Sequence, residues 1–168
     1  MTSPRTVAPE RTPADQAGWD DERLHLMGLF IGAHARLTRA LGAELEEQAG
    51  LPLTWFDVLV CLRRAPEGRL TMTELASQVL LTSGGVTRLV DRIAEAGYVE
   101  RQQCPSDRRS VHVVLTEAGR EKLDGSLPGH LAGLDEHLFG PLSIEERNEL
   151  AHALTKLVGD APTCGGAA

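Results

Sequence analysis

Residues 71–119, TMTELASQVLLTSGGVTRLVDRIAEAGYVERQQCPSDRRSVHVVLTEAG, contain the most informative structural pattern of the chain. Thr71 and Glu74 have the spacing of a capping box, which predicts the start of a short helix. A second helix is predicted from Thr82 or Ser83 to Gly97. Two strands follow, joined by a polar turn that contains proline. Two short helices followed by a β-hairpin are typical of a winged helix-turn-helix, which places one helix in the DNA major groove.

Before this stretch, the apolar residues recur with the 3.6-residue period of helices. A long helix is predicted over 20–48, because Gly50 and Pro52 follow it directly. The next helix is predicted to begin at Thr54, acting as its cap, and to stop in the segment 64–68.

At the end of the stretch 71–119, a helix is predicted to start at Thr116. It is predicted to be interrupted at Pro128, because proline lacks the amide hydrogen that a helix interior needs. The helical pattern resumes over 130–138, and Ser143 with Glu146 forms a second capping box for a last helix. The predicted fold is therefore mostly α-helical with a small β-wing, in the order four helices, two strands and two helices.

The chain is expected to form one folded domain. Residues 1–18, which contain three prolines, and residues 159–168 are predicted to be disordered. The predicted divisions are a single domain over 19–158, its winged head over 54–116, and flanking helices over 20–48 and 117–158.

Charge is distributed unevenly along these 168 residues. The formal net charge is −7, whereas residues 82–116 alone carry +1, so the acidic excess lies outside the predicted head. This pattern argues against a protein that coats nucleic acid and favours a selective binder. The N-terminus lacks the apolar core of a secretory signal, and the three cysteines are too scattered for a disulfide framework. We expect a cytoplasmic protein without a membrane partner.

The second helix of the decisive stretch has the side chains that DNA reading needs. With Val86, Val90 and Ile93 facing inward, the helical period turns short hydroxyls and arginines outward. Gly84 and Gly85 let the backbone approach a phosphate, although a merely loosened helix start remains the alternative. The residues predicted to contact DNA, including two arginines at the hairpin tip, are Ser83, Gly84, Gly85, Thr87, Arg88, Arg92, Arg108 and Arg109.

The hairpin tip, Asp107-Arg108-Arg109, is expected to reach the minor groove, whose concentrated negative potential attracts arginine. A solvated turn whose aspartate pairs with its neighbours is the alternative. Asp91 lies on the outward helix face and would repel phosphate, so we expect it to pair with a wing arginine, with Arg109 the first choice. Asp91 and Asp107 are thus the predicted links between wing and helix.

These residues resemble the MarR family of bacterial transcription regulators. The resemblance extends from about Asp20 to Val158 and is most specific at 107–119, DRRSVHVVLTEAG, which fits the family's D-x-R wing followed by L-T-x-x-G. The segment 81–97 also fits the family's recognition helix. The resemblance implies a homodimer, joined through its first and last helices, that binds a pseudo-palindromic DNA operator. The apolar stripes of those helices independently favour a second subunit.

The resemblance also implies a repressor that releases DNA when a small phenolic or lipophilic effector binds. Plausible lining residues, each also compatible with ordinary core or surface, are Phe30, His34, Trp55, Phe56 and Arg63.

Enzymatic chemistry is not expected, because no nucleophile motif, glycine-rich phosphate loop or convergent acid pair occurs. We expect no cofactor and no metal site: His130 and His137 share a helix face but lack a third ligand nearby in the sequence. Two alternatives stay open. One is a winged-helix interaction module that does not bind DNA, and the other is a redox sensor that acts through the Cys104 thiol.

Overall fold

The computed structural model describes residues 20–79, 83–103 and 111–159. It divides into two compact units, residues 1–37 and residues 38–168, and the boundary falls inside the first described helix, α2 (Glu22–Ala49). The segment 1–18, predicted to be disordered, lies outside the described residues, as does 160–168. The described part of the first unit consists of residues 20 and 21 and the N-terminal part of α2, and the carboxylate of Asp21 pairs with Arg23 there at 2.6 Å.

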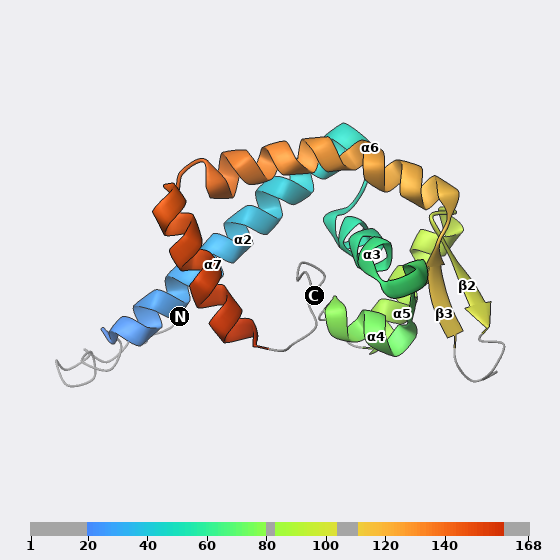
Figure 1. Cartoon of the computed structure of the whole chain (residues 1–168), viewed down its shortest axis with the longest axis horizontal. Helices are drawn as coiled ribbons and strands as arrows, with labels where there is room; N and C mark the ends of the chain where they lie inside the picture. Colours follow the sequence, from blue (N-terminus) through green and yellow to red (C-terminus); the bar gives the residue numbers. More distant parts are fainter. Residues whose placement is uncertain (1–19, 80–82, 104–110, 160–168) are drawn as a thin grey trace, which may run out of the picture. The chain divides into compact units, whose positions relative to one another are not determined.

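The fold is mostly helical with a small antiparallel sheet, which confirms the predicted class (Figure 1). In chain order the remaining elements are α3 (Leu53–Arg64), the 3₁₀ turn η1 (Pro66–Gly68), β1 (Arg69–Thr71), α4 (Met72–Gln78), α5 (Ser83–Glu95), β2 (Val99–Gln103), β3 (Val111–Leu115), α6 (Glu117–Leu134), the π-helical turn η2 (Asp135–Phe139) and α7 (Ile144–Val158). No helix in the described ranges is both long enough and apolar enough to cross a bilayer.

The sheet has three strands in the order β1-β3-β2, all antiparallel. Strands β2 and β3 are the predicted hairpin, with Arg101 opposite Val113. Strand β1 was not predicted, because three residues are too few to show an alternating pattern. Leu70, opposite Val113 and 5% exposed, anchors β1 in the core.

The core of the second unit lies where α3, α4 and α5 meet the sheet (Figure 1). Residues of all three helices are fully buried there: Leu59, Leu62, Leu75, Val86, Val90 and Ile93. Because Val86, Val90 and Ile93 are 0% exposed, they fix the rotation of α5 about its axis. Helix α5 ends as predicted, with Gly97 at φ 82° and the Tyr98 amide donating to the Ile93 carbonyl at 3.1 Å.

Both predicted capping boxes are present: Thr71 with Glu74 starts α4, and Ser143 with Glu146 starts α7. The predicted cap of α3 by Thr54 is wrong. Pro52 precedes that helix instead, and its carbonyl accepts from the Trp55 amide at 2.9 Å. Since the ring of Pro52 already holds φ at −57°, the chain turns into the helix before it reaches Thr54.

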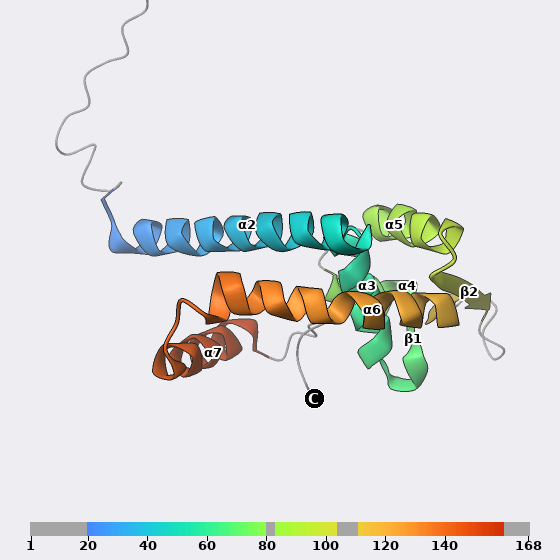
Figure 2. The same cartoon turned by 90° about the horizontal axis from the view of Figure 1, so that it is seen from above.

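The predicted interruption at Pro128 is also wrong, because α6 runs unbroken through this residue (Figure 2). Packing on both sides of the proline holds the helix together. The centroids of the His130 ring and the Phe56 ring of α3 lie 4.4 Å apart, and the buried Leu123 side chain packs in the core. The exposed ring of Pro128 therefore costs a backbone hydrogen bond without breaking the helix.

Candidate DNA-binding site

The outer face of α5 is the candidate DNA-reading surface. Thr87, Arg88 and Arg92 are exposed there, opposite the fully buried Val86, Val90 and Ile93. A rigid inner face and a polar outer face are what an element needs in order to enter a major groove. Contact between these residues and DNA stays a prediction.

The first turn of α5 leaves its backbone open. A Cβ added at Gly84 would meet nothing within 4 Å. The first turn of a helix is a common phosphate-binding position, because its amide hydrogens point along the axis away from the helix. Ser83 begins the helix, but its side chain lies outside the described residues.

Arg101 of β2 connects the wing to this helix. Its guanidinium lies 2.7 Å from the Asp91 carboxylate and donates to the Thr87 carbonyl at 3.4 Å. Asp91 thus pairs with an arginine of the wing's first strand. Arg108 and Arg109, together with Asp107, lie outside the described residues, so the pairing predicted with Arg109 stays a prediction. The Arg101 contact was missed because no local pattern indicates which residue of a strand faces a neighbouring helix.

Arg92 lies beside an aromatic side chain rather than standing clear of the surface. Its guanidinium carbon is 5.7 Å from the Trp55 ring centroid, and Trp55 meets Tyr98 edge to face at 6.3 Å. On the far side, the Lys122 ammonium lies 5.9 Å from the Tyr98 ring and donates to the Ala49 carbonyl at 2.5 Å. This row of two rings between two cations links α5 through α3 to α6.

At the junction between β3 and α6, the structure explains why the Leu-Thr-x-x-Gly segment contains Thr116 and Gly119. The Thr116 hydroxyl donates to the Gly97 carbonyl at 2.7 Å and accepts from the Gly119 amide at 3.0 Å. A Cβ on Gly119 would overlap the Tyr98 carbonyl. This Leu-Thr-x-x-Gly segment therefore holds the end of α5, the wing and the start of α6 in one arrangement.

The predicted effector-lining residues have different surroundings. Phe56 is 3% exposed and belongs to the core, Trp55 is half-buried in the row described above, and Arg63 is exposed near the end of α3. Phe30 and His34 are exposed on the first unit. A common pocket formed by these residues stays a prediction.

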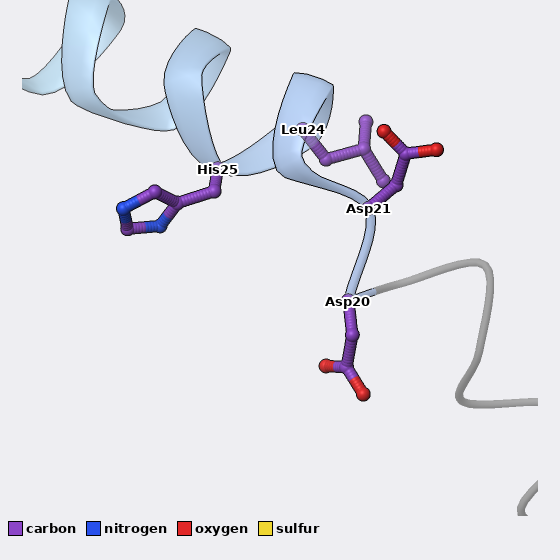
Figure 3. Close-up of a pocket in the computed structure, with 4 residues that line it drawn as sticks. All are labelled: Asp20, Asp21, Leu24 and His25. Carbon is purple, nitrogen blue, oxygen red and sulfur yellow. The ribbon is translucent and has the colours of Figure 1, made fainter.

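A hollow at the start of α2 is lined by Asp20, Asp21, Leu24 and His25 (Figure 3). The side chains point in different directions around the helix rather than toward one point. Arg23 already binds Asp21, and its hydrogen bonds lower the pKa of that carboxyl. The hollow contains none of the residues predicted to contact DNA.

Comparison with known proteins places this geometry among bacterial regulators. A family model described as "MarR family" matches residues 49–110. The uncharacterised HTH-type transcriptional regulator YkoM of Bacillus subtilis is 35% identical over 111 residues, covering 66% of this chain and 70% of YkoM. The transcriptional repressor MprA of Escherichia coli is 30% identical over 137 residues, covering 82% of this chain and 77% of MprA.

A solved structure has the same fold. Sco3205 from Streptomyces coelicolor, described as a MarR family transcriptional regulator in complex with DNA, superposes with a TM-score of 0.74 and 28% identity. The match covers 94% of this chain and 98% of Sco3205.

Proposed function

Because this chain belongs to the MarR family of DNA-binding transcriptional regulators, we propose that it is a ligand-responsive repressor that binds a pseudo-palindromic operator as a homodimer. The observation that carries the proposal is α5, whose apolar face is fully buried while Thr87 and Arg88 remain exposed. A regulator of this kind acts where the chromosome is, which supports a cytoplasmic location.

Each part of the surface has a proposed role. Ser83, Thr87 and Arg88 read base edges in the major groove, where arginine bonds guanine with two hydrogen bonds. Arg92 contacts the DNA backbone, a role supported by its position over Trp55, which limits its reach. Arg108 and Arg109 enter the minor groove.

The homodimer is supported by apolar side chains that one chain leaves in water. Six large apolar residues of α2 between positions 24 and 31 are at least half exposed: Leu24, Leu26, Met27, Leu29, Phe30 and Ile31. On α6 and α7 the same is true of Leu131, Ile144 and Leu157. Exposed apolar surface on this scale is typical of an interface. Two winged heads then meet two half-sites centred about 10 base pairs apart.

The effector is proposed to be a small phenolic or lipophilic molecule that binds near Trp55. The support is the row from Arg92 through Trp55 and Tyr98 to Lys122, because a ring inserted beside Trp55 displaces Arg92 and shifts α5. Because α5 is the proposed DNA-reading helix, a shift of α5 would by itself be enough to release the operator.

The test uses operator DNA selected from a random library and measures affinity by fluorescence anisotropy. Arg88→Ala is expected to cost about 1–3 kcal/mol on the selected operator and much less on random DNA. Arg92→Ala is expected to weaken both and to reduce the salt dependence of binding by about one ion. Lys156→Ala, which removes an exposed cation from α7, is the matched control.

Three results would each contradict part of the proposal. An equal loss on both DNAs from Arg88→Ala would show that this side chain contacts phosphate only. Absence of salt-dependent binding by the unmodified protein to every selected DNA would indicate an interaction module. If operator release instead requires an oxidant and is lost in Cys104→Ser, the chain is a thiol-based sensor.

A further inference from the structure

Three side chains of types that commonly bind metal ions meet between α2 and η2. Glu44 comes from α2, and Glu136 and His137 come from η2. One ligand atom from each lies within 4.8 Å of the other two. All three residues belong to the second unit. The sequence offers no hint of this cluster, because Glu44 is far from the other two along the chain.

Two glycines of α6 let side chains of α2 reach across and bring the three residues together. Gly129 and Gly133 face α2, and a Cβ on either glycine would overlap the side chain of Gln48 or Glu44. Without side chains at these two positions, the Glu44 carboxylate passes α6 and reaches His137, whose Nε2 lies 2.5 Å from Glu44 Oε1. The helix changes to a π-turn at the same point, with the Gly140 amide donating to the Asp135 carbonyl at 2.6 Å. Such turns occur often at functional sites.

The cluster carries more negative charge than its protein neighbours neutralise. Two carboxylates stand around one imidazole, and the Glu44 and His137 side chains are only 30% and 21% exposed. Among the described residues, no lysine or arginine forms an ion pair with Glu44 or Glu136. A cation placed between the three groups would supply the missing positive charge.

We propose that Glu44, Glu136 and His137 bind a divalent transition-metal ion of the zinc class, which joins α2 to α6. One imidazole and two carboxylates are borderline ligands that suit Zn²⁺ or Co²⁺ better than Mg²⁺ or Ca²⁺, which prefer oxygen alone. Ligand atoms about 2.1 Å from a tetrahedral ion stand roughly 3.4 Å apart, so Glu44 Oε1 and His137 Nε2, 2.5 Å apart here, have to open by about 1 Å while the Glu136 carboxylate closes on the ion. Glu136 is exposed and free to make that movement. Three protein ligands leave a further position for water.

This site is independent of the proposed operator binding, and its test needs no DNA. Untagged full-length protein, first treated with chelator, is titrated with Zn²⁺ by isothermal calorimetry. The expected result is one saturable site per chain, together with a higher Tm in the presence of Zn²⁺. His137→Ala and Glu44→Gln are each expected to weaken binding at least about tenfold. His152→Ala, on the polar face of α7, is the matched control and is expected to bind like the unmodified protein.

Two further measurements establish whether these three side chains themselves hold the ion. The Co²⁺ complex is expected to show weak absorption bands without the intense sulfur-to-metal band of a cysteine site. Gly133→Ala keeps all three ligands but adds a methyl group against the Glu44 carboxylate, so it is also expected to weaken binding. Circular dichroism establishes that each variant is folded. The proposal is overturned if the folded protein binds no Zn²⁺, if folded His137→Ala binds as tightly as the unmodified protein, or if Co²⁺ gives a thiolate spectrum.

Discussion

Arg101 makes the contacts that tie the wing to the candidate reading helix. Its guanidinium pairs with Asp91 at 2.7 Å and reaches the Thr87 carbonyl at 3.4 Å. The Arg101 and Asp91 side chains are 35% and 52% exposed, so water screens the pair and its contribution to stability is small. The pair matters because of where it lies: Arg101 neutralises an aspartate on the helix face that is predicted to meet phosphate.

Replacing Asp91 with Asn is therefore expected to loosen the wing with little change in overall stability. The free energy of unfolding is expected to change by less than about 1 kcal/mol, because the pair is exposed. Hydrogen exchange of the β2 and β3 amides is expected to become faster. Glu95→Gln removes an acidic charge from the same helix without touching Arg101 and serves as control. Unchanged exchange in Asp91→Asn would show that the pair does not order the wing.

His130 has an unusual environment for a titratable side chain. Its Nδ1 is buried and has no hydrogen-bond partner among the described residues, and its ring packs 4.4 Å from Phe56. Burial lowers the pKa of His130 below its usual 6.5, while the charge of Glu44 raises it by a smaller amount. The folded chain therefore favours the neutral imidazole.

It follows that stability falls on acidification. The unfolded chain takes up the His130 proton near pH 6.5, whereas the folded chain resists it until lower pH. This part of the stability is present above pH 6.5 and is lost as pH falls through that value toward the pKa of the folded state. Urea unfolding at about pH 7.5 and pH 5.5 measures the effect. In His130→Leu the difference between the two pH values is expected to shrink, and an equal difference in both proteins would contradict the assignment.

At the scale of elements, predictions based on local hydrogen bonding were confirmed, whereas predictions that ignored the neighbouring residues and helices were wrong. The two capping boxes form as predicted, because a side chain and a backbone amide three residues apart find each other without help from the rest of the fold. The predicted helix interruption at Pro128 and the predicted helix cap at Thr54 were wrong. At Pro128, packing of α6 against α3 outweighs one lost hydrogen bond, and at Thr54 the earlier Pro52 determines where the helix starts.

The continuous α6 predicts that Pro128 is a local defect. In Pro128→Ala the residue regains an amide that can donate to the carbonyl one turn earlier, and the exposed ring leaves no cavity in the core. The free energy of unfolding is expected to rise by about 1–3 kcal/mol, as measured by urea denaturation. Leu127→Ala, at the neighbouring exposed position, controls for alanine's helix propensity. A loss of stability in Pro128→Ala would show instead that the packing of α6 needs the proline.

At the scale of the whole molecule, the distribution of apolar surface dominates. The winged head forms most of one buried core, whereas α7 has no buried residue and α2 buries only Leu41 and Leu45. Helices with one apolar face in water are stable when a second surface covers that face. This imbalance supports the proposed homodimer.

The homodimer predicts that a charge on the apolar face of α7 separates the subunits. The double variant Ile144→Glu and Leu157→Glu places carboxylates at positions that are 70% and 77% exposed in one chain, so the fold of the single chain tolerates them. Light scattering is expected to give about twice 18.1 kDa for the unmodified protein and about that value for the variant. His152→Glu, on the polar face of α7, is expected to remain dimeric. Equal masses for all three proteins would rule out this face as the interface.

Features that depend on neighbours within a few residues could be predicted from the amino-acid order alone. Helix periodicity, the two capping boxes, the stop at Gly97 and the hairpin strands all follow from short-range geometry, and together they identified the winged head. Strand β1 was too short to show such a pattern.

Contacts between residues far apart in the chain became known from the folded structure. It paired Asp91 with Arg101, set Arg92 over Trp55, carried α6 through Pro128 and brought Glu44 to His137. Periodicity along the chain determines which face of an element is buried, whereas the partner across that face depends on how the elements pack. Contacts between residues far apart in the chain leave no local pattern in the sequence.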